Sequence, residues 1–284
     1  MQDFAGKAAF VTGGASGIGL ALGRAFLEAG MRVMLADIEQ TALDQALAGL
    51  KAYDNRVRGV IVDVADRAAM QRAANEAIAS FGRIHVLCNN AGVGGGGPQG
   101  QIAAADWDWT IDINLNGVFN GIAEFLPHIR AHGEGGHIVN TASMAGMISV
   151  PMMAPYCASK YAVVALSEGL AGELDGSNIG VSVLCPGWVR TRINDSGRNR
   201  PSRYGAGSAP PPAAAARAAM VAEALKAGMD PAVVAARVLA AIRDNDLYIF
   251  THPEMRGPVE ERFRRILAAF DKAPALNAAA QAKA

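Results

Sequence analysis

The stretch that decides the fold is "KAAFVTGGASGIG", residues 7–19, where a short apolar run leads directly into a glycine-rich turn. The apolar run is typical of a buried strand, and a helix is expected to open at Gly17. Gly13 permits a tight turn, Gly17 lets the backbone approach a phosphate, and Gly19 allows close contact between helix and strand. Because free N–H groups at the start of such a helix bind a pyrophosphate, the stretch predicts a dinucleotide site.

The same alternation of apolar strands and longer helical patterns continues along most of the 284 residues. The expected strands are 7–12, 31–36, 57–62, 84–89, 137–142, 179–185 and 247–251. Helices are expected from Gly17 and at 39–51, 67–81, a long stretch ending near 131, 155–174 and 230–245. Strands that are apolar throughout and separated by helices indicate a parallel sheet covered on both faces. We therefore predict a doubly wound, Rossmann-type α/β fold with about seven strands.

Only one long stretch interrupts this alternation, at residues 195–229, and it is first polar and then rich in proline and alanine. An excursion of this length between a strand and a helix is usually a functional lid. Since no linker or repeat is visible, we expect one domain over residues 1–284, with a substrate lid at about 195–229. The alanine-rich tail is expected to fray from about residue 274.

Composition limits the partners and the compartment. The chain has 26 basic and 26 acidic residues, which predicts neither a nucleic acid nor a membrane surface as partner. An arginine-rich cluster at 190–203 is interpreted as a solvated loop or as an anion-binding site. The N-terminus has no long apolar core, and the three cysteines show no Cys-x-x-Cys spacing, so a cytoplasmic location is predicted. Because no His-Glu-x-x-His motif is present, no metal is expected.

The second strand ends in an acid, Asp37, that bears on cofactor choice. A carboxylate at this position can accept both hydroxyls of the adenosine ribose and would repel a 2′-phosphate. Ile38 follows it, and no lysine or arginine lies in the glycine turn to neutralise that phosphate. The simpler alternative is an aspartate of a turn at the end of a strand. The pattern favours NAD over NADP.

Small or polar residues follow the fourth, fifth and sixth strands, where ligands bind in such sheets. Ser143 ends the fifth strand, and Tyr156 and Lys160 begin the helix that follows it. Residues four apart share one helix face, so the phenol and the ammonium are expected to line the same cleft. A tyrosine that merely packs on a lysine stem is the alternative. Asn114 is an amide in otherwise apolar helical surroundings.

The set "TGGASGIG", Asp37, Asp63, "NNAG", Asn114, Ser143, "YCASK" and "PGWVRT" resembles the short-chain dehydrogenase/reductase family, over residues 5–250 or so. The resemblance implies a catalytic triad of Ser143, Tyr156 and Lys160, with Asn114 completing a proton relay. Asp63 and Val64 would hold the adenine, and Thr191 would contact the carboxamide. The implied cofactor-binding residues are Gly13, Ser16, Gly17, Ile18, Gly19, Asp37, Asp63, Val64, Asn89, Ala91, Tyr156, Lys160, Pro186, Gly187, Val189 and Thr191. It also implies a homodimer or homotetramer.

The chemistry that follows is hydride transfer between NAD(H) and a secondary alcohol or ketone. Tyrosine has an ordinary pKa of about 10, and a lysine ammonium in a cleft short of water is expected to lower it, as is an oxidised nicotinamide. Ser143 would hold the substrate oxygen, and Tyr156 would take or give its proton.

The loop "MAGMISVPMM" after Ser143, together with Trp188, predicts an apolar pocket for a bulky or aromatic alcohol. Residues 244–263 are similar to part of bacterial dehydrogenases that oxidise benzylic alcohols of lignin-type aryl ethers. Against this, the arginines of 190–203 favour a 3-hydroxyacyl thioester or another carboxylate-bearing substrate. A protein of another class, a sensor that binds NAD without catalysing a reaction, is a further alternative. A hydrolase is disfavoured because the sequence has no Gly-x-Ser-x-Gly motif. The segment "GVGGGGP" (92–98) makes a loose pocket wall.

Overall fold

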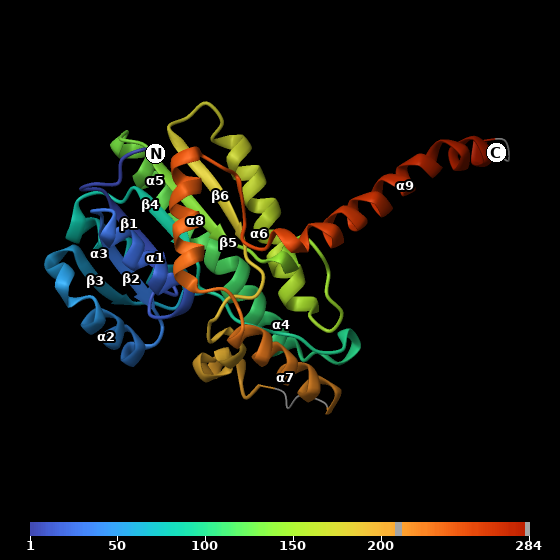
Figure 1. Ribbon diagram of the computed structural model, residues 1–284, viewed down its shortest axis with the longest axis horizontal. Coiled ribbons are helices and arrows are strands. Elements are labelled where there is room, and N and C mark those ends of the chain that lie inside the picture. The colour runs from blue at the N-terminus through green and yellow to red at the C-terminus, as the bar shows by residue number, and fades with distance from the viewer. Residues whose placement is uncertain (208–211, 282–284) are drawn as a thin grey trace. The chain divides into compact units, whose positions relative to one another are not determined.

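The computed structural model describes residues 1–207 and 212–281 of the chain. Within these residues seven parallel strands form one sheet in the order β3-β2-β1-β4-β5-β6-β7 (Figure 1). The strands are β1 Ala8–Thr12, β2 Arg32–Asp37, β3 Val57–Ile61, β4 Val86–Asn89, β5 Gly136–Thr141, β6 Ile179–Cys185 and β7 Tyr248–Phe250. The predicted doubly wound α/β fold is therefore confirmed.

Helices connect these strands and cover both faces of the sheet (Figure 1). They are α1 Gly17–Glu28, α2 Gln40–Gly49, α3 Arg67–Phe81, α4 Ala104–Ile111, α5 Gly117–His132, α6 Ala154–Glu173, α7 Pro212–Lys226 and α8 Pro231–Asp244. A further helix, α9 Arg256–Gln281, follows the last strand. Right-handed crossovers between parallel strands account for this two-sided cover.

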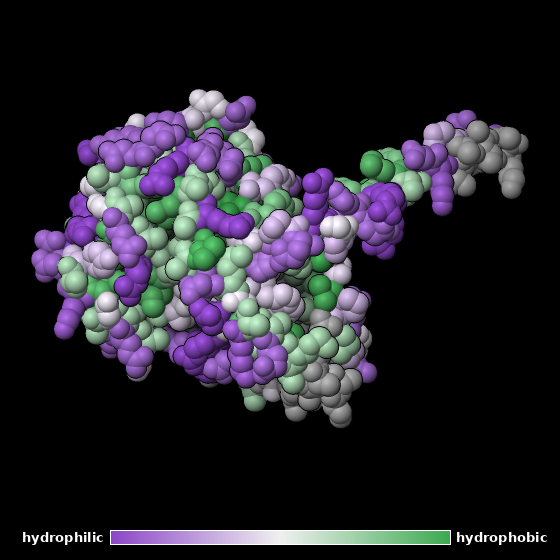
Figure 2. Space-filling view, in the orientation of Figure 1, coloured by the Kyte–Doolittle hydropathy of each residue, from purple (hydrophilic) through white to green (hydrophobic). Residues whose placement is uncertain are grey.

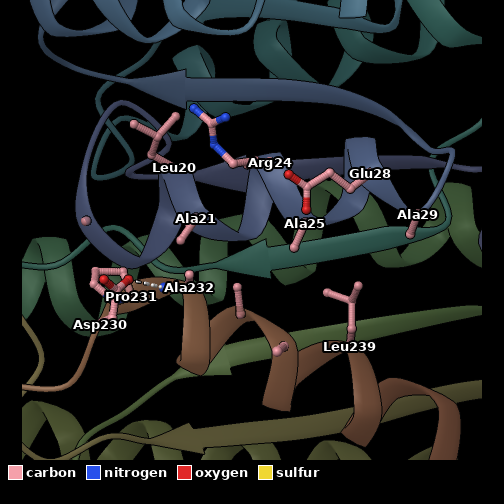
Figure 3. A pocket seen from close by; sticks show the side chains of 13 residues that line it. Leu20, Ala21, Arg24, Ala25, Glu28, Ala29, Asp230, Pro231, Ala232 and Leu239 are labelled. Carbon is pink, nitrogen blue, oxygen red and sulfur yellow. Dashed lines mark hydrogen bonds between the residues drawn. The ribbon is translucent and has the colours of Figure 1, made fainter.

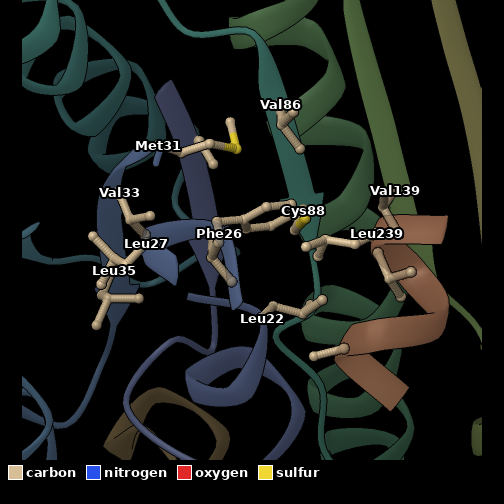
Figure 4. Packing of buried hydrophobic residues seen from close by; sticks show 14 of the residues in the cluster. Leu22, Phe26, Leu27, Met31, Val33, Leu35, Val86, Cys88, Val139 and Leu239 are labelled. Atoms are coloured by element: carbon tan, nitrogen blue, oxygen red, sulfur yellow. The ribbon is translucent and has the colours of Figure 1, made fainter. Parts of the chain in front are cut away.

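Two apolar cores lie on the two faces of the sheet. One joins α1, α2 and α8 to the strands and includes Leu22, Phe26 and Leu239, which lie close together in Figure 4. The other joins α3, α5 and α6 and includes Met70 and Phe125. Because strands between two such cores are buried on both sides, their sequences are apolar throughout rather than alternating.

The strand order reverses beside β1, which pairs with β2 on one side and with β4 on the other. The crossovers that leave the two strands therefore run in opposite directions, and they leave a crevice at the carboxyl ends of the strands. The loops after β1, β4, β5 and β6 meet at this edge. The glycine turn and Ser143 lie in two of these loops.

The structure differs from the sequence prediction in two stretches. The long helix ending near residue 131 is divided into α4 and α5 by a π-helical turn, Asp112–Asn116. The stretch 195–229 was expected to be irregular except for a short helical segment before Asp230. The structure has two short 3₁₀ segments, Ile193–Asn199 and Ser202–Tyr204, followed by α7, which occupies 15 residues. Residues 208–211 of that stretch lie outside the described part of the chain, and its role as a lid stays a prediction.

The chain divides into two compact units, Met1–Thr251 and His252–Ala284. The first contains the whole sheet. The second contains the 3₁₀ segment Pro253–Met255 and helix α9, which continues through Pro274 to Gln281. Residues 282–284 lie outside the described part, and fraying of the tail stays a prediction, as does a single domain over the whole chain.

Candidate active site

The glycine turn has the backbone geometry that a phosphate site requires. Gly13 and Gly17 have φ angles of +62° and +52°, a region that favours glycine. A Cβ atom on Gly13 would lie 2.9 Å from the Ala91 Cα, and one on Gly17 would lie 3.0 Å from the Thr191 Cγ2. Ser16 precedes α1 without capping it by its side chain, so N–H groups of the first helical turn remain for an anion.

Asp37 ends β2 directly beside this turn. Its Oδ2 accepts a hydrogen bond from the Ala15 N–H at 3.0 Å, and its Oδ1 accepts one from the Glu39 N–H at 3.1 Å. Each carboxylate oxygen has a further lone pair for a ribose hydroxyl. The glycine turn and the acid thus form one rigid unit, and their geometry fits the adenosine end of a dinucleotide.

Two residues that sequence reasoning did not single out fix the glycine turn to β4. The Thr12 Oγ1 accepts hydrogen bonds from the N–H groups of Asn90, at 2.9 Å, and Ala91, at 3.0 Å. The Asn90 Nδ2 donates in return to the Thr12 carbonyl oxygen at 3.0 Å. The signal was present in the "NNAG" segment, but which of its two asparagines faces the turn depends on the strand register.

Ser143, Tyr156 and Lys160 come together at the carboxyl end of β5. The Ser143 Oγ accepts a hydrogen bond from the Ala145 N–H at 3.1 Å, which fixes its position at the start of a 3₁₀ turn. Lys160 is buried, and its Nζ donates to the Thr141 carbonyl oxygen at 2.9 Å. The Lys160 Nζ lies 5.7 Å from the centre of the Tyr156 ring. The predicted trio therefore shares one site.

The electrostatics of this trio differ from the sequence expectation. Burial raises the pKa of the Tyr156 phenol, while a hydrogen bond with the Ser143 side chain acts in the opposite direction. Burial also lowers the pKa of Lys160 to about 8. In the protein alone the pKa of Tyr156 thus moves against the expected direction, because burial of the phenol outweighs its hydrogen bond with Ser143. The lowering expected with oxidised nicotinamide bound stays a prediction.

Asn114 lies in the π-helical turn and is fully buried. Its Oδ1 accepts a hydrogen bond from the Val93 N–H at 2.8 Å. Its Nδ2 donates to the Val93 carbonyl oxygen at 3.0 Å and to the Ser159 Oγ at 3.2 Å. A Cβ atom on Gly92 would lie 3.3 Å from the Asn114 Oδ1 and 3.5 Å from the Lys160 Nζ, so amide and ammonium flank the same glycine.

Some of the other predicted cofactor residues lie beyond the carboxyl ends of their strands, whereas the side chain of Asn89 points into the core. Asp63 lies beyond β3 and is paired with Arg203 at 2.6 Å. Val189 and Thr191 follow β6, and Thr191 contacts the glycine turn as described above. Asn89, in contrast, directs its side chain into the core, where its Nδ2 donates to the Asn140 Oδ1 at 2.9 Å. Only the backbone of Asn89 is left to line the cleft.

The glycine-rich segment 92–98, expected to be loose, is closely packed at two of its glycines. A Cβ atom on Gly95 would overlap the Thr110 side chain, and one on Gly96 would overlap the Met152 carbonyl oxygen. The Gly97 N–H donates to that same oxygen at 2.8 Å. The segment is thus attached to the loop before α6, and glycine is needed for close approach.

Among the described residues, one cluster consists of side chains that could bind a metal ion: His85, His132 and Glu134. Their potential ligand atoms lie within 4.8 Å of one another. Their ring nitrogens already have partners. The His85 Nδ1 accepts from the Ala8 N–H at 3.2 Å, and its Nε2 contacts Glu134 at 2.9 Å. The His132 Nε2 lies 3.0 Å from the Ile84 carbonyl oxygen. A metal would have to displace these bonds, so the cluster fits an internal hydrogen-bond network better.

A groove of about 500 Å³ runs between α1 and α8 (Figure 3). It begins at Gly17, alanine is the commonest residue of its lining, and its charged side chains are those of Arg24, Glu28 and Asp230. None of the Ser143, Tyr156 and Lys160 side chains contributes to it. The groove is therefore distinct from the cleft in which the three side chains meet.

Among the described residues, no helix combines the length and the apolar character needed to cross a bilayer. The family model for short chain dehydrogenases matches residues 7–201. The C alpha-dehydrogenase of Sphingobium sp. (strain NBRC 103272 / SYK-6) is 36% identical over 269 residues, which cover 94% of this chain and 87% of that protein. The D-threitol dehydrogenase of Mycolicibacterium smegmatis is 38% identical over 188 residues, covering 66% of this chain and 72% of that protein.

A solved structure extends the comparison to the cofactor. A short chain dehydrogenase/reductase from Burkholderia phymatum, crystallised in complex with NAD, superposes with a TM-score of 0.92. It is 38% identical, and the match covers 95% of this chain and 97% of that chain. The NAD in that complex supports the cofactor predicted from Asp37.

Proposed function

Since the chain belongs to the short-chain dehydrogenase/reductase family, we propose that it transfers a hydride between NAD(H) and a secondary alcohol or ketone. The predicted family is confirmed by the matches above. The observation that carries the proposal is the meeting of Ser143, Tyr156 and Lys160 beside the glycine turn and Asp37. That arrangement provides an acid/base pair, a donor for the substrate oxygen and a dinucleotide site within one crevice.

In the proposed reaction the Ser143 Oγ holds the alcohol oxygen, and the Tyr156 phenol takes its proton during oxidation or returns it during reduction. Bound NAD⁺ supplies the hydride acceptor. The raised pKa of Tyr156 makes the protonated phenol the dominant form at neutral pH, which suits proton donation to a ketone. Rising pH then favours the phenolate, and with it alcohol oxidation.

Lys160 and Asn114 have supporting roles in this proposal. With its pKa lowered to about 8, Lys160 is still mostly protonated at pH 7. Its Nζ is held in place by the Thr141 carbonyl oxygen and lies near the tyrosine ring. Asn114 fixes the backbone at Val93 and borders the same glycine as the ammonium. In this proposal the two side chains keep the groups that pass on the proton in position at the rear of the cleft.

For the substrate we propose a bulky or aromatic secondary alcohol. The loop after Ser143 supplies Met147, Ile148, Met152 and Met153, all partly exposed, and methionine adapts to irregular apolar shapes. Trp188, on the loop after β6, is 44% exposed. The 36%-identical relative from Sphingobium is a C alpha-dehydrogenase, which supports oxidation at a Cα carbon of the substrate.

The arginines between 190 and 203 give less support to an acidic substrate than the sequence suggested. Each has a carboxylate partner within the described residues: Arg190 with Asp230, Arg192 with Asp195, Arg198 with Glu39, Arg200 with Asp106 and Arg203 with Asp63. A guanidinium already paired with an acid has less to offer a substrate carboxylate or a coenzyme A thioester.

A substrate panel tests the proposal. Benzylic secondary alcohols, 3-hydroxyacyl thioesters, steroids and polyols are each supplied with NAD, and absorbance at the NADH band is followed. We expect the highest kcat/KM for a benzylic alcohol, whereas a thioester or a polyol far ahead of all others would refute the aromatic assignment. Turnover itself separates an enzyme from the non-catalytic NAD sensor.

Two variants test the roles of the site residues. Tyr156→Phe should abolish turnover and leave NADH binding intact, because only the phenolic hydroxyl group is lost. Lys160→Ala should impair both turnover and binding. Substantial activity in the phenylalanine variant would show that another group exchanges the proton.

Assembly and location are proposals as well. We propose a homodimer or homotetramer, which light scattering tests directly; a monomer mass would refute it. The cytoplasmic location stays a prediction.

A further inference from the structure

The segment Ile193–Tyr204, here named the strap, follows β6 and makes ion pairs with Glu39 beyond β2 and with Asp63 beyond β3. It comprises two 3₁₀ segments after β6. In Figure 1 it is drawn in gold near α7, and in Figure 2 hydrophilic side chains gather over that lower part of the view. Its arginines and Tyr204 interact with acidic side chains of several other elements. These interactions form two attachments, one buried and one more exposed.

The first attachment is buried and lies against α4 and the π-helical turn. The side chain of Arg200 is 8% exposed, pairs with Asp106 at 2.8 Å and lies 5.0 Å above the centre of the Trp109 ring. The Tyr204 hydroxyl donates to Asp112 at 2.8 Å. Because these groups are shielded from water, this side of the strap is firmly held.

The second attachment is more exposed and lies at the adenosine end. The Arg198 guanidinium makes hydrogen bonds to both carboxylate oxygens of Glu39, at 2.7–3.2 Å, and the Asn199 Nδ2 adds another at 2.8 Å. Arg198 is the main reason that the pKa of Glu39 is held below its ordinary value. Glu39 is tied in turn to Asp37 through its N–H. The strap is thus fastened two residues beyond the acid assigned to the ribose.

Arg203 fastens the strap at a second point of the adenosine end. Its Nη2 lies 2.6 Å from the Asp63 Oδ2, and the Asp63 Oδ1 already accepts the Ala65 N–H at 3.0 Å. The Asp63 side chain is 15% exposed and that of Arg203 is 47% exposed. An adenine that uses Asp63 as acceptor therefore meets Arg203 at a carboxylate on which each oxygen already has one partner.

We propose that Arg198 and Arg203 are positioning residues for the cofactor, and that their ion pairs with Glu39 and Asp63 must open each time NAD(H) enters or leaves. This inference rests on the proposed function. The buried attachment through Arg200 stays closed during the exchange. From residue 195 onward the strap is part of the predicted substrate lid, so it links that lid to the adenosine end of the cofactor.

The test measures cofactor exchange without any substrate. NADH is bound to the full-length protein, and its dissociation and association rate constants are determined by stopped-flow fluorescence for wild type, Arg198→Gln, Arg203→Gln and the double variant. We expect each single variant to release NADH about three- to fivefold faster, in line with the strength of partly exposed ion pairs. The association of NADH should accelerate as well, because ion pairs that have to open slow both the entry and the release of the cofactor.

Salt and matched variants add independent readouts. Raising NaCl should accelerate release from the wild type and have little effect on the double variant, because salt screens only the pairs that remain. Arg203→Lys, which keeps the charge, should restore slow release. Glu39→Gln should reproduce the effect of Arg198→Gln without adding to it. Arg83→Gln, which breaks an exposed pair with Glu134 at the opposite edge of the sheet, should exchange NADH at the wild-type rate.

The outcomes are distinguishable. If NADH binds and all variants exchange it at the wild-type rate, or if Arg83→Gln accelerates exchange as much as they do, the strap proposal is overturned and the proposed function stands. If the wild type does not bind NADH, the proposed function and the strap proposal both fail.

Discussion

His137 lies in β5, between β4 and β6, and its imidazole ring is fully buried. The ring contacts the Ser182 Oγ through its Nε2 at 2.8 Å, and within the described residues its Nδ1 has no hydrogen-bond partner. Burial lowers the pKa of His137 from 6.5 to about 3. The folded protein therefore keeps this histidine neutral at pH values at which the unfolded chain binds a proton.

The sign and size of the effect on stability follow from this difference. Below about pH 6.5 the unfolded state carries the extra proton, so the free energy of unfolding decreases as the pH falls, until the folded-state pKa of about 3 is reached. With pKa values of 6.5 in the unfolded chain and about 3 in the folded protein, His137 alone lowers the free energy of unfolding by about 2 kcal/mol between pH 7.5 and pH 5.0. Burial lowers the pKa of His85 as well, which adds a loss of the same sign.

Urea unfolding followed by tryptophan fluorescence at the two pH values measures the loss. In His137→Gln, which can keep the bond to Ser182, the loss should be smaller than in the wild type by about 2 kcal/mol. The exposed His128 on α5 is the matched control, and His128→Gln should behave as the wild type does. An equal pH dependence in His137→Gln and wild type would refute the reasoning, as would an NMR titration of His137 near pH 6 in the folded protein.

Three further substitutions test the cofactor site and its support. Asp37→Ala combined with Ile38→Arg should shift the kcat/KM ratio from NADH towards NADPH, because it removes the repulsion of a 2′-phosphate; an unchanged ratio would contradict the assignment. Gly19→Ala should weaken NADH binding at least tenfold in a fluorescence titration, since its Cβ would overlap the Gly13 carbonyl oxygen, and wild-type affinity would show that the turn can relax. Asn114→Ala should lower the free energy of unfolding by about 1–3 kcal/mol, because it leaves buried backbone groups without partners. An unchanged urea midpoint would exclude that structural role.

The sheet was predictable because inner strands such as β1 and β4 are buried on both faces and are therefore short apolar runs, whereas the edge strands β3 and β7 are partly exposed. Local spacing was also enough to place Tyr156 and Lys160 on one face of α6. The pairing of Arg198 with Glu39 was not predictable, because 159 residues separate the partners and nothing local orients them. For the protein alone the pKa of Tyr156 was predicted in the wrong direction, since the sequence shows the neighbouring charge but not the depth of burial.

The π-helical turn at Asp112–Asn116 also limits how the length of this stretch can change. Each residue added to or removed from a helix rotates everything beyond it by about 100°. α4 packs against α6, and α5 packs against α3, so both helices are fixed in rotation by different neighbours. Deleting one residue from the turn would produce a regular helix, but α4 or α5 would then rotate away from the helix against which it packs. Asn114 would rotate away from its partners as well. Insertions and deletions among homologous chains should therefore avoid 112–116 and collect in the exposed loops on either side.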